Sequence, residues 1–572
     1  MSEIRNPILP GFHPDPSILR VGEDYYIATS TFEWFPGVQI HHSRDLVNWE
    51  LISYPLSRVS QLNMLGEDNS CGVWAPCLSY DKGTYYLIYT DVKSFLGMFK
   101  DTHNYLVTAK DIRGPWSEPI YLNSSGFDPS LFHDVNGKKY LVNMLMDYRS
   151  YQTKFAGIVL QEYSEEKQCL VGERMNIFKG TPAGLTEGPH LYQHDGYYYL
   201  MTAEGGTGYQ HGVMMARSKK IEGPYEPDPA GHMLTTRHLP AWGLQKAGHA
   251  SIVKGTNGKW YLAHLCGRPV GEKRRCILGR ETALQEVIWK DGWLRMADNT
   301  NRPALQVSIP DVKICEKGHD LKEEFDQEQW SIHLQTLRVP LGNRASLTER
   351  PGYLRLYGAE SPNSRYEQSL LAHRQQSFCC EVNTKLEFDP QHFQQMAGLI
   401  YYYNTLGYYY LYVTQDEMLG RVLSIIACDT GAGTHPIGAG VPIPKGKPVY
   451  LRLNIQTEKA WFSYSVDGKQ FERIGPDLDA TILSDDYYEE TTGHGMFTGA
   501  FIGICCQDLA GTRKYADFDY FITKNRKNKD SYDEKEIKEW QFGATRYLFF
   551  VIAVYFLSGI ISSQYPSGSE MK

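Results

Sequence analysis

One short phrase occurs five times in the first half of this chain, and it restricts the fold more than any other feature. The first copy, GFHPDPSIL at 11–19, leads through a turn into YYI at 25–27. The later copies are WAPCL at 74–78, FDPSL at 127–131, EGPHL at 187–191 and GHASI at 248–252. Each runs through a turn that contains glycine into an aromatic strand, so the phrase marks one repeated supersecondary unit.

The spacing of the copies predicts a repeat architecture built from strands. With Asp15, Ala75, Asp128, Glu187 and His249 taken as equivalent positions, the spacings are 60, 53, 59 and 62 residues. Short β-branched and aromatic runs separated by Gly, Asn and Asp turns indicate hairpins rather than helices. We therefore expect an all-β protein whose residues 1–312 form a five-bladed β-propeller.

The repeat also predicts where side chains meet. Blades of a propeller are arranged radially around a central channel, so equivalent positions at the start of each innermost strand gather near one axis. Asp15, Asp128, Glu187 and His249 then lie together, with Trp74 beside them. A single Asp before Pro is more often a turn former. Three acids at matching positions favour a shared site.

Composition narrows the choice of function. The formal net charge is −8 and the pI is near 6.2, so the chain lacks the basic surplus of nucleic-acid-binding proteins, and we expect no nucleic acid partner. The first residues lack the apolar core of a secretory signal, which predicts a cytoplasmic location. The 11 cysteines include no Cys-x-x-Cys pair. We expect free and mostly buried thiols.

The second half of the chain has a different pattern. A charged, irregular stretch at 313–324 is interpreted as a linker, and the long aromatic strands at 325–523 predict a jelly-roll-like β-sandwich. The remainder, 524–572, is an atypical tail with 15 apolar residues at 547–561, fewer than the ~20 that span a bilayer. A packed segment or a shifted-frame tail is favoured over a membrane anchor.

Three carboxyl groups in one funnel, with aromatic side chains beside them, are typical of glycosidic bond hydrolysis. One carboxyl group protonates the leaving oxygen and another handles the attacking group. Crowded negative charges keep one acid protonated near neutral pH. Arg280 has two functional interpretations, pairing with an axial carboxylate or holding substrate hydroxyl groups; the structural alternative is an ordinary pair with Glu281 or another surface acid. His249 has no second His at an equivalent position, so no set of metal ligands is predicted.

At this point the sequence resembles the β-xylosidases of glycoside hydrolase family 43. The resemblance covers about 6–523 and depends on FEWFPGVQIHHS at 32–43, TEGPHLY at 186–192 and QQMAGL at 394–399. It implies a five-bladed propeller with a C-terminal sandwich. It also implies exo-acting, inverting release of xylose from short β-1,4-xylooligosaccharides, with α-L-arabinofuranosidase side activity in many members.

The resemblance assigns roles to individual residues. Asp15 matches the general base, Glu187 the general acid, and Asp128 the carboxylate that orients the acid and tunes its pKa. The residues expected to bind or enclose the sugar are Phe32, Trp74, Phe127, Thr207, His249, Arg280 and Phe497, the last on a loop of the sandwich. Met146 departs from the pattern, because close relatives carry Trp there.

Further expectations concern partners and alternatives. The resemblance implies xylooligosaccharide substrates, a homo-oligomer (tetramer or dimer), no required cofactor, and room for a divalent cation, calcium, in the propeller channel. An α-L-arabinofuranosidase or arabinan-acting hydrolase on the same propeller is the alternative enzyme. A non-catalytic sugar-binding propeller with a lectin-like sandwich is the alternative outside enzymes.

Overall fold

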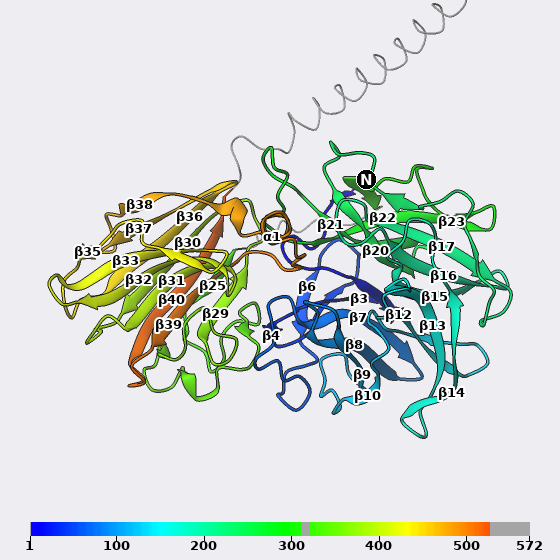
Figure 1. Cartoon of the computed structure of the whole chain (residues 1–572), viewed down its shortest axis with the longest axis horizontal. Helices are drawn as coiled ribbons and strands as arrows, with labels where there is room; N and C mark the ends of the chain where they lie inside the picture. Colours follow the sequence, from blue (N-terminus) through cyan, green and yellow to red (C-terminus); the bar gives the residue numbers. More distant parts are fainter. Residues whose placement is uncertain (1, 310–319, 527–572) are drawn as a thin grey trace, which may run out of the picture. The chain divides into compact units, whose positions relative to one another are not determined.

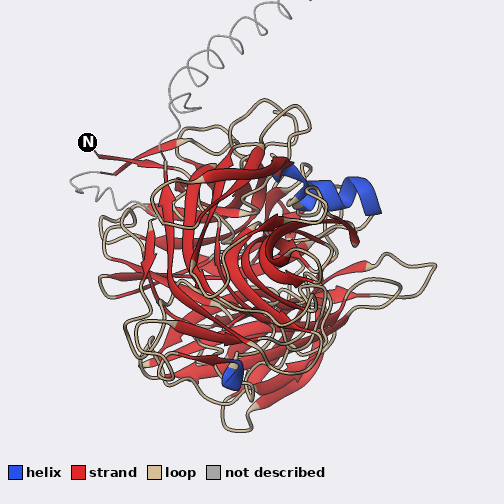
Figure 2. Cartoon of the chain, turned by 90° about the vertical axis from the view of Figure 1, so that its left-hand side faces the viewer, coloured by secondary structure: helices blue, strands red, loops and turns tan. Residues whose placement is uncertain are grey.

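A computed structural model describes residues 2–309 and 320–526 and consists almost entirely of strands (Figure 2). In Figure 1 the segments coloured blue to green form the propeller sheets, and those coloured yellow to orange belong to the sandwich. The predicted fold class, a five-bladed propeller followed by a β-sandwich, is confirmed.

Five antiparallel sheets make the propeller, each with its strands mostly in sequence order. The first sheet is β2 (Ser17–Val21), β3 (Asp24–Thr29), β5 (Gln39–Ser43) and β6 (Glu50–Ser53), and the second is β7 (Gly72–Asp81), β8 (Thr84–Ser94), β9 (Asp101–Ala109) and β10 (Ile120–Asn123). The third is β11 (Ser130–His133), β12 (Lys139–Met146), β13 (Phe155–Ser164) and β14 (Cys169–Phe178). The fourth is β15 (Glu187–His194), β16 (Tyr197–Glu204), β17 (Gly212–Ser218) and β18 (Glu226–Pro227), and β19 (Leu234–Thr235) also pairs with β17. The fifth is β20 (Gln245–Lys254), β21 (Trp260–Gly267), β22 (Glu281–Lys290) and β23 (Trp293–Met296).

The innermost strands close into a ring. Strand β2 contacts β7, β7 contacts β11, β11 contacts β15, β15 contacts β20, and β20 returns to β2. Small hydroxyl side chains tie neighbouring blades: the Leu78 N–H donates to Ser17 Oγ at 3.0 Å, and the Ile18 N–H donates to Ser251 Oγ at 2.8 Å. Strand β1 (Ser2–Arg5) pairs with β24 (Gln306–Ile309), so the two ends of the repeat region meet.

The backbone shows which repeat positions are truly equivalent. Four of them adopt the left-handed conformation: Asp15 at φ 55° just ahead of β2, Asp128 at 54° just ahead of β11, Ala75 at 32° within β7 and His249 at 41° within β20. In the fourth blade the left-handed residue is Gly188, at φ 56°. The predicted equivalence of Glu187 was therefore wrong by one residue. Proline follows the left-handed residue at 16, 76, 129 and 189, which gives the correct alignment.

The sandwich contains two large antiparallel sheets. In the eight-stranded sheet the order is β27 (Ala345–Ser346), β28 (Leu354–Tyr357), β40 (Tyr515–Asn525), β30 (Cys379–Glu387), β36 (Val449–Gln456), β37 (Lys459–Ser465) and β38 (Glu472–Asp479), with β25 (Leu321–Glu323) on β40. In the seven-stranded sheet it is β29 (Ser369–Arg374), β39 (Phe501–Asp508), β31 (Gln395–Asn404), β32 (Gly407–Asp416), β33 (Gly420–Asp429) and β34 (Ala432–Thr434), with β35 (Val441–Pro442) on β33. Strand β36 alternates buried and partly exposed residues, as expected when only one face of a sheet lies on a core.

Strands β25 and β40 adjust the expected limits of the sandwich. Within the range predicted as the linker, residues 313–319 lie outside the described part of the chain, whereas Leu321–Glu323 already pairs with β40. Strand β40 continues to Asn525, two residues past the expected end. The apolar segment at 547–561 lies outside the described residues. Among the residues that are described, no helix has the length and apolar character to cross a membrane.

The propeller and the sandwich share one apolar core. Strand β4 (Trp34–Phe35) of the propeller region pairs with β26 (Thr336–Leu337). The fully buried Trp34 ring stacks on Phe501 with ring centres 3.7 Å apart and an interplanar angle of 12°. Two 3₁₀ turns, η1 (Gly342–Arg344) and η2 (Ala480–Ile482), and helix α1 (Asp485–Thr492) complete the described elements. Cysteines in the described segments form no disulfide, and all but Cys169 are buried, as predicted.

Candidate active site

The three predicted acids lie close enough to influence one another. Asp15 precedes β2, Asp128 precedes β11, and Glu187 begins β15. Burial raises the pKa of Asp128 well above its ordinary value, and the charges of Glu187 and Asp15 raise it further. Burial, followed by the charge of Asp15, raises the pKa of Glu187 to about 7. The ring of blades thus brings together carboxyl groups separated by 59 to 172 residues in the sequence.

Asp15 is held by one hydroxyl group and one guanidinium. Ser30 Oγ donates a hydrogen bond to Asp15 Oδ2 at 2.7 Å, and the same hydroxyl oxygen accepts the Ala75 N–H at 2.8 Å. Arg280 Nη1 lies 3.3 Å from Asp15 Oδ1, and His249 Nδ1 lies 3.7 Å from the same oxygen. These contacts hold the Asp15 carboxyl group in place in a site where only 5 % of the residue is exposed.

Asp128 is linked to Glu187 through the backbone. The N–H of Gly188, the residue after Glu187, donates to Asp128 Oδ2 at 3.0 Å. Because Gly188 has a left-handed φ of 56° and a Cβ there would lie 3.2 Å from the His249 ring, glycine suits this position. Asp128 therefore fixes the chain segment from which the Glu187 side chain projects.

Arg280 joins the acids to the sandwich. Besides Asp15, its Nη1 donates to Thr207 Oγ1 at 3.1 Å, and its Nη2 donates to the carbonyl oxygen of Phe497 at 2.8 Å. The alternative partner, Glu281, is instead paired with Arg268 at 2.7 Å. Arg280 thus faces the axial site, and the sandwich loop reaches it as the resemblance implied.

Aromatic rings line the same region. Ring centres lie 5.9 Å apart for Phe32 and Trp74, 5.4 Å for Trp74 and Phe127, and 5.5 Å for Trp74 and Phe497. The two predicted roles for the aromatic cluster at 32–37 are filled by different residues. Phe32 packs beside Trp74 in the site, whereas Trp34 packs in the core between the domains. Such rings suit the apolar faces of a pyranose.

Phe497 reaches the propeller because helix α1 places the loop that follows it. Ser484 caps the helix by accepting the Tyr487 N–H, and two acids occupy the first turn, which suits the positive end of the helix dipole. Asp486 in that turn pairs with the buried Lys246 of β20 at 2.6 Å and accepts the Cys276 N–H at 2.8 Å. These bonds anchor the sandwich on the fifth blade.

Sequence reasoning missed Lys100, which precedes β9 and belongs to no repeated phrase. Its Nζ lies 5.1 Å from the centre of the Phe95 ring, 5.5 Å from Trp74 and 6.0 Å from Phe127. Burial lowers the pKa of Lys100, while the negative charge of Glu187 opposes that shift. No motif at 97–100 identifies this lysine, since only folding brings it to the acids.

Met146 and His249 are both buried side chains. Met146 ends β12, is 8 % exposed and belongs to the same apolar cluster as Trp74 and Phe127. His249 is buried, and burial lowers the pKa of its ring. Residues 2–309 and 320–526 contain no group of three or more His, Cys, Asp or Glu side chains placed to hold a metal ion.

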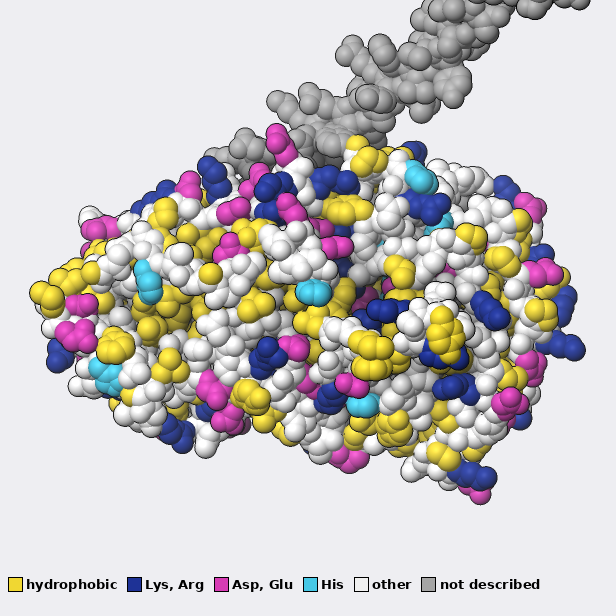
Figure 3. Space-filling view, viewed as in Figure 1, with side chains coloured by type: hydrophobic (Ala, Val, Ile, Leu, Met, Phe, Trp, Pro, Cys, Tyr) yellow, Lys and Arg dark blue, Asp and Glu magenta, His cyan; other side chains and the backbone are white. Residues whose placement is uncertain are grey.

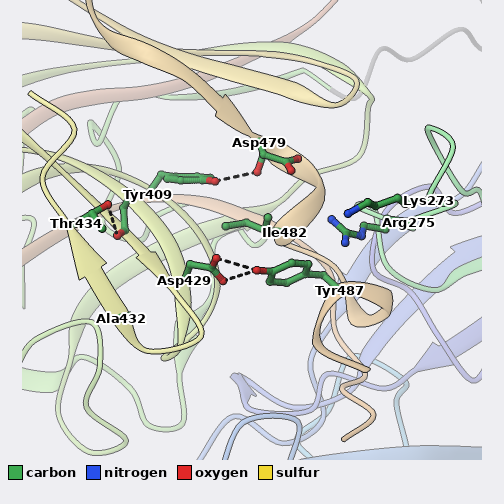
Figure 4. A pocket seen from close by; sticks show the side chains of 10 residues that line it. Lys273, Arg275, Tyr409, Asp429, Ala432, Thr434, Asp479, Ile482 and Tyr487 are labelled. Atoms are coloured by element: carbon green, nitrogen blue, oxygen red, sulfur yellow. Dashed lines mark hydrogen bonds between the residues drawn. The ribbon is translucent and has the colours of Figure 1, made fainter. Parts of the chain in front are cut away.

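A separate cleft of about 450 Å³ lies between the 268–276 loop of the propeller and the sandwich (Figure 4). Its polar groups largely satisfy one another: the Tyr487 hydroxyl donates to Asp429 at 2.8 Å, and Arg275 pairs with Glu490 at 2.7 Å. None of the three acids lines this cleft. Over the face drawn in Figure 3, acidic and basic side chains are interspersed rather than gathered into one basic patch.

Comparison with known proteins decides the family. The model described as "Glycosyl hydrolases family 43" matches residues 4–294, and that described as "Beta xylosidase C-terminal Concanavalin A-like domain" matches 322–524. The chain belongs to glycosyl hydrolases family 43. As a member of family 43 it is a glycoside hydrolase, and the resemblance found in its motifs is confirmed.

Similar family 43 proteins cover almost the whole chain. A "Beta-xylosidase" of Bacillus subtilis (strain 168) is 52% identical over 536 residues, which is 92% of this chain and all of that protein. A "Xylosidase/arabinosidase 43B" of Humicola insolens is 51% identical over 91% of this chain and 98% of its own length. The crystal structure of a xylan beta-1,4-xylosidase from Bacillus halodurans C-125 has a TM-score of 0.88 at 54% identity, covering 91% of this chain and 100% of that chain.

Proposed function

We propose that this protein is an exo-acting, inverting β-1,4-xylosidase that releases xylose from the non-reducing end of short xylooligosaccharides. The observation that carries the proposal is the set of three neighbouring acids: Asp15 and Asp128 are buried, and the half-buried Glu187 has a pKa raised to about 7. The names of the similar family 43 proteins support xylose as the sugar.

In this proposal each acid has one task. Asp15, bound by Ser30 and Arg280, takes a proton from the water that attacks the anomeric carbon. Glu187, with its pKa raised to about 7, keeps a large protonated fraction near neutral pH and gives its proton to the glycosidic oxygen as that bond breaks. Asp128 binds the N–H beside Glu187 and keeps the acid in place. Inversion requires the base and the acid to stand roughly 6.5–9.5 Å apart, leaving room for the water.

The walls of the site favour removal of one terminal sugar. Phe32, Trp74 and Phe127 come from the propeller, and Phe497 of the sandwich packs against Phe32 and Trp74, so that both domains contribute to the aromatic wall. A pocket closed by two domains accepts a chain end more easily than the middle of a polymer. Arg280 and Thr207 present donors to the sugar hydroxyl groups from the same side as the base.

Time-resolved NMR on xylobiose tests the proposal in one experiment. We expect free xylose to appear with the α-anomer in excess at early times, because inversion of a β-xyloside gives the α-product. A β-anomer that forms first would reject inversion, and no hydrolysis of xylobiose would reject the xylosidase assignment. Asp15→Ala serves as the matched inactive control.

An α-L-arabinofuranosidase is the second candidate function, favoured by the name of the Humicola insolens protein. Aryl β-xyloside and aryl α-arabinofuranoside compared at equal concentration separate the two activities. We expect the xyloside to react with the larger kcat/KM and the arabinofuranoside to report the side activity. A larger kcat/KM for the arabinofuranoside would reverse the order of the two candidates.

The cytoplasmic location, the tetramer or dimer, and calcium in the channel stay predictions. Light scattering on the purified protein measures the oligomer. Calorimetric titration with CaCl₂ after dialysis against chelator tests the cation, which the described side chains alone do not enclose. No step of the proposed mechanism passes through a cation.

A further inference from the structure

Ser70 connects Trp74 of the propeller to the sandwich loop that carries Phe497. Its carbonyl oxygen accepts the indole N–H of Trp74 at 2.8 Å. Its Oγ accepts the backbone N–H of Phe497 at 3.0 Å and donates toward Met496 Sδ at 3.6 Å. One buried residue, 1 % exposed, therefore bonds to the Trp74 indole and to the Phe497 backbone, and the rings of these two residues pack edge to face with centres 5.5 Å apart.

Ser70 is held in place by Glu33, which is in turn bound by Arg338 of the sandwich. Its N–H donates to Glu33 Oε2 at 3.0 Å, and the carbonyl oxygen of Glu33 accepts the Arg338 N–H at 2.7 Å. The Arg338 guanidinium also donates to Glu67 O at 2.7 Å and to Asn69 Oδ1 at 3.3 Å, within the same loop. The loop before β7 is thus held by residues of both domains.

The bond from Ser70 to Phe497 leads on to the acids. Across the Phe497 peptide group, the N–H is bound by Ser70 and the carbonyl oxygen by Arg280 at 2.8 Å. Arg280 in turn binds Asp15 at 3.3 Å. A shift of Phe497 away from Ser70 would separate its ring from Trp74 and open the aromatic wall at that contact.

We propose that Ser70 is a positioning residue that sets the separation of Trp74 and Phe497, and through it the fit of the pocket around one terminal sugar. This inference rests on the proposed function, because the fit is measured with xylobiose. Ser70 touches neither the reacting atoms nor the three acids in the bonds described above. Its effect passes through the two rings and through Arg280.

Ser70→Gly isolates the hydroxyl group. Ser70 has a φ of 60°, which glycine adopts without strain, and the backbone bonds to Glu33 and Trp74 are available to any residue. Only the bonds of Oγ to Met496 and Phe497 are lost. The matched control is Lys82→Gly, which removes an exposed side chain at another left-handed position, φ 47°, in the turn between β7 and β8.

The aromatic rings around the sugar are expected to stabilise the bound substrate and the transition state equally. Weakening their contacts therefore raises KM and leaves kcat nearly unchanged. We expect Ser70→Gly to raise KM for xylobiose about tenfold, the order expected when a buried N–H loses its partner, with kcat changed less than about twofold. A crystal structure of the variant is expected to show the Phe497 ring moved away from Trp74, with Arg280 still bound to Asp15. Lys82→Gly is expected to leave KM and kcat unchanged.

Two outcomes overturn the inference. A Ser70→Gly enzyme with an unchanged KM, or with a lower melting temperature and lower kcat at the original KM, would make Ser70 a structural residue only. A crystal structure with Phe497 and Trp74 in their original places would do the same without reference to turnover. By contrast, a native enzyme that fails to hydrolyse xylobiose rejects the proposed function, while the crystallographic comparison still decides the role of Ser70.

Discussion

At the scale of single residues, Asp15 and Glu187 differ in surroundings and therefore in expected response to substitution. We predict that Glu187→Ala slows xylobiose hydrolysis by about 10²–10⁴-fold, the usual contribution of a general acid. A xyloside with a dinitrophenolate leaving group needs no proton and is expected to keep most of its rate. Asp15→Ala is expected to abolish turnover of both substrates. Steady-state kinetics on the two substrates measure the difference.

The control for this comparison is Glu173→Ala, an exposed acid on the outer strand β14. Its kinetics are expected to match those of the native enzyme. Equal losses on xylobiose and on the activated xyloside in Glu187→Ala would contradict the assignment of Glu187 as the acid.

Lys100 gives a prediction on pH dependence. A general acid works while protonated, and the pKa of Glu187 is raised to about 7, so kcat/KM is expected to fall as pH rises through about 7. The positive charge of Lys100 stabilises the Glu187 carboxylate and lowers that pKa. Lys100→Met removes the charge, so the basic limb of the pH profile is expected to move to higher pH.

Lys179→Met, which removes an exposed lysine outside the site, is the matched control. Its basic limb is expected to coincide with that of the native enzyme. A limb that moves to lower pH in Lys100→Met, or does not move, would show that another group controls the profile.

Sequence reasoning located the site residues that belong to the repeated phrase. Asp15 and Asp128 precede proline in matching phrases, and the ring of blades placed them together. Glu187 reached the same site although the predicted alignment was wrong by one residue. Lys100 and Ser70 were missed because neither belongs to a repeated phrase. Lys100 lies near Trp74, 26 residues away in the same blade, and near Phe127 at the start of the next blade, whereas Ser70 bonds to Phe497 of the sandwich.

At the scale of elements, the pairing of β1 with β24 joins the ends of the propeller. Ile4 on β1 is 3 % exposed and packs in a cluster with Val307 and Ile309. We predict that Ile4→Ala lowers the free energy of unfolding by about 2–4 kcal/mol, the usual cost of this truncation in a core. Urea titration followed by circular dichroism measures the change.

Val135→Ala is the control, since Val135 is 82 % exposed in the turn between β11 and β12. It is expected to change the free energy of unfolding by less than about 0.5 kcal/mol. The same small change in Ile4→Ala would mean that β1 contributes little to closing the ring.

Strands were predicted correctly where their own residues carry an aromatic or alternating pattern, and were missed where they do not. Aromatic runs such as YYL at 198–200 predicted β16 and its counterparts from neighbouring residues alone. Strand β25 was assigned to the linker because its three residues carry no pattern, and its partner Thr523 lies about 200 residues away. Short strands whose stability comes from a distant partner leave little trace in their own sequence.

At the scale of the whole molecule, the propeller and the sandwich share a single apolar core. One contiguous cluster contains Phe12 and Trp34 of the propeller together with Tyr402 and Phe501 of the sandwich. Arg374, 2 % exposed on β29, donates to the Phe12 carbonyl oxygen at 2.6 Å across the same boundary. Separating the domains would expose these groups, so neither is expected to unfold alone.

We predict that calorimetry of the native protein shows one unfolding transition and that Trp34→Ala divides it into two. The substitution removes the ring stacked on Phe501 and is expected to lower stability by about 3–5 kcal/mol, mostly at the boundary between the domains. Phe393→Ala, which truncates a ring that is 54 % exposed, is expected to leave one transition. Two transitions in the native protein would show that the shared core does not couple the domains, and the closing of the sugar site by Phe497 would then depend on the bonds of Ser70 and Arg280 alone.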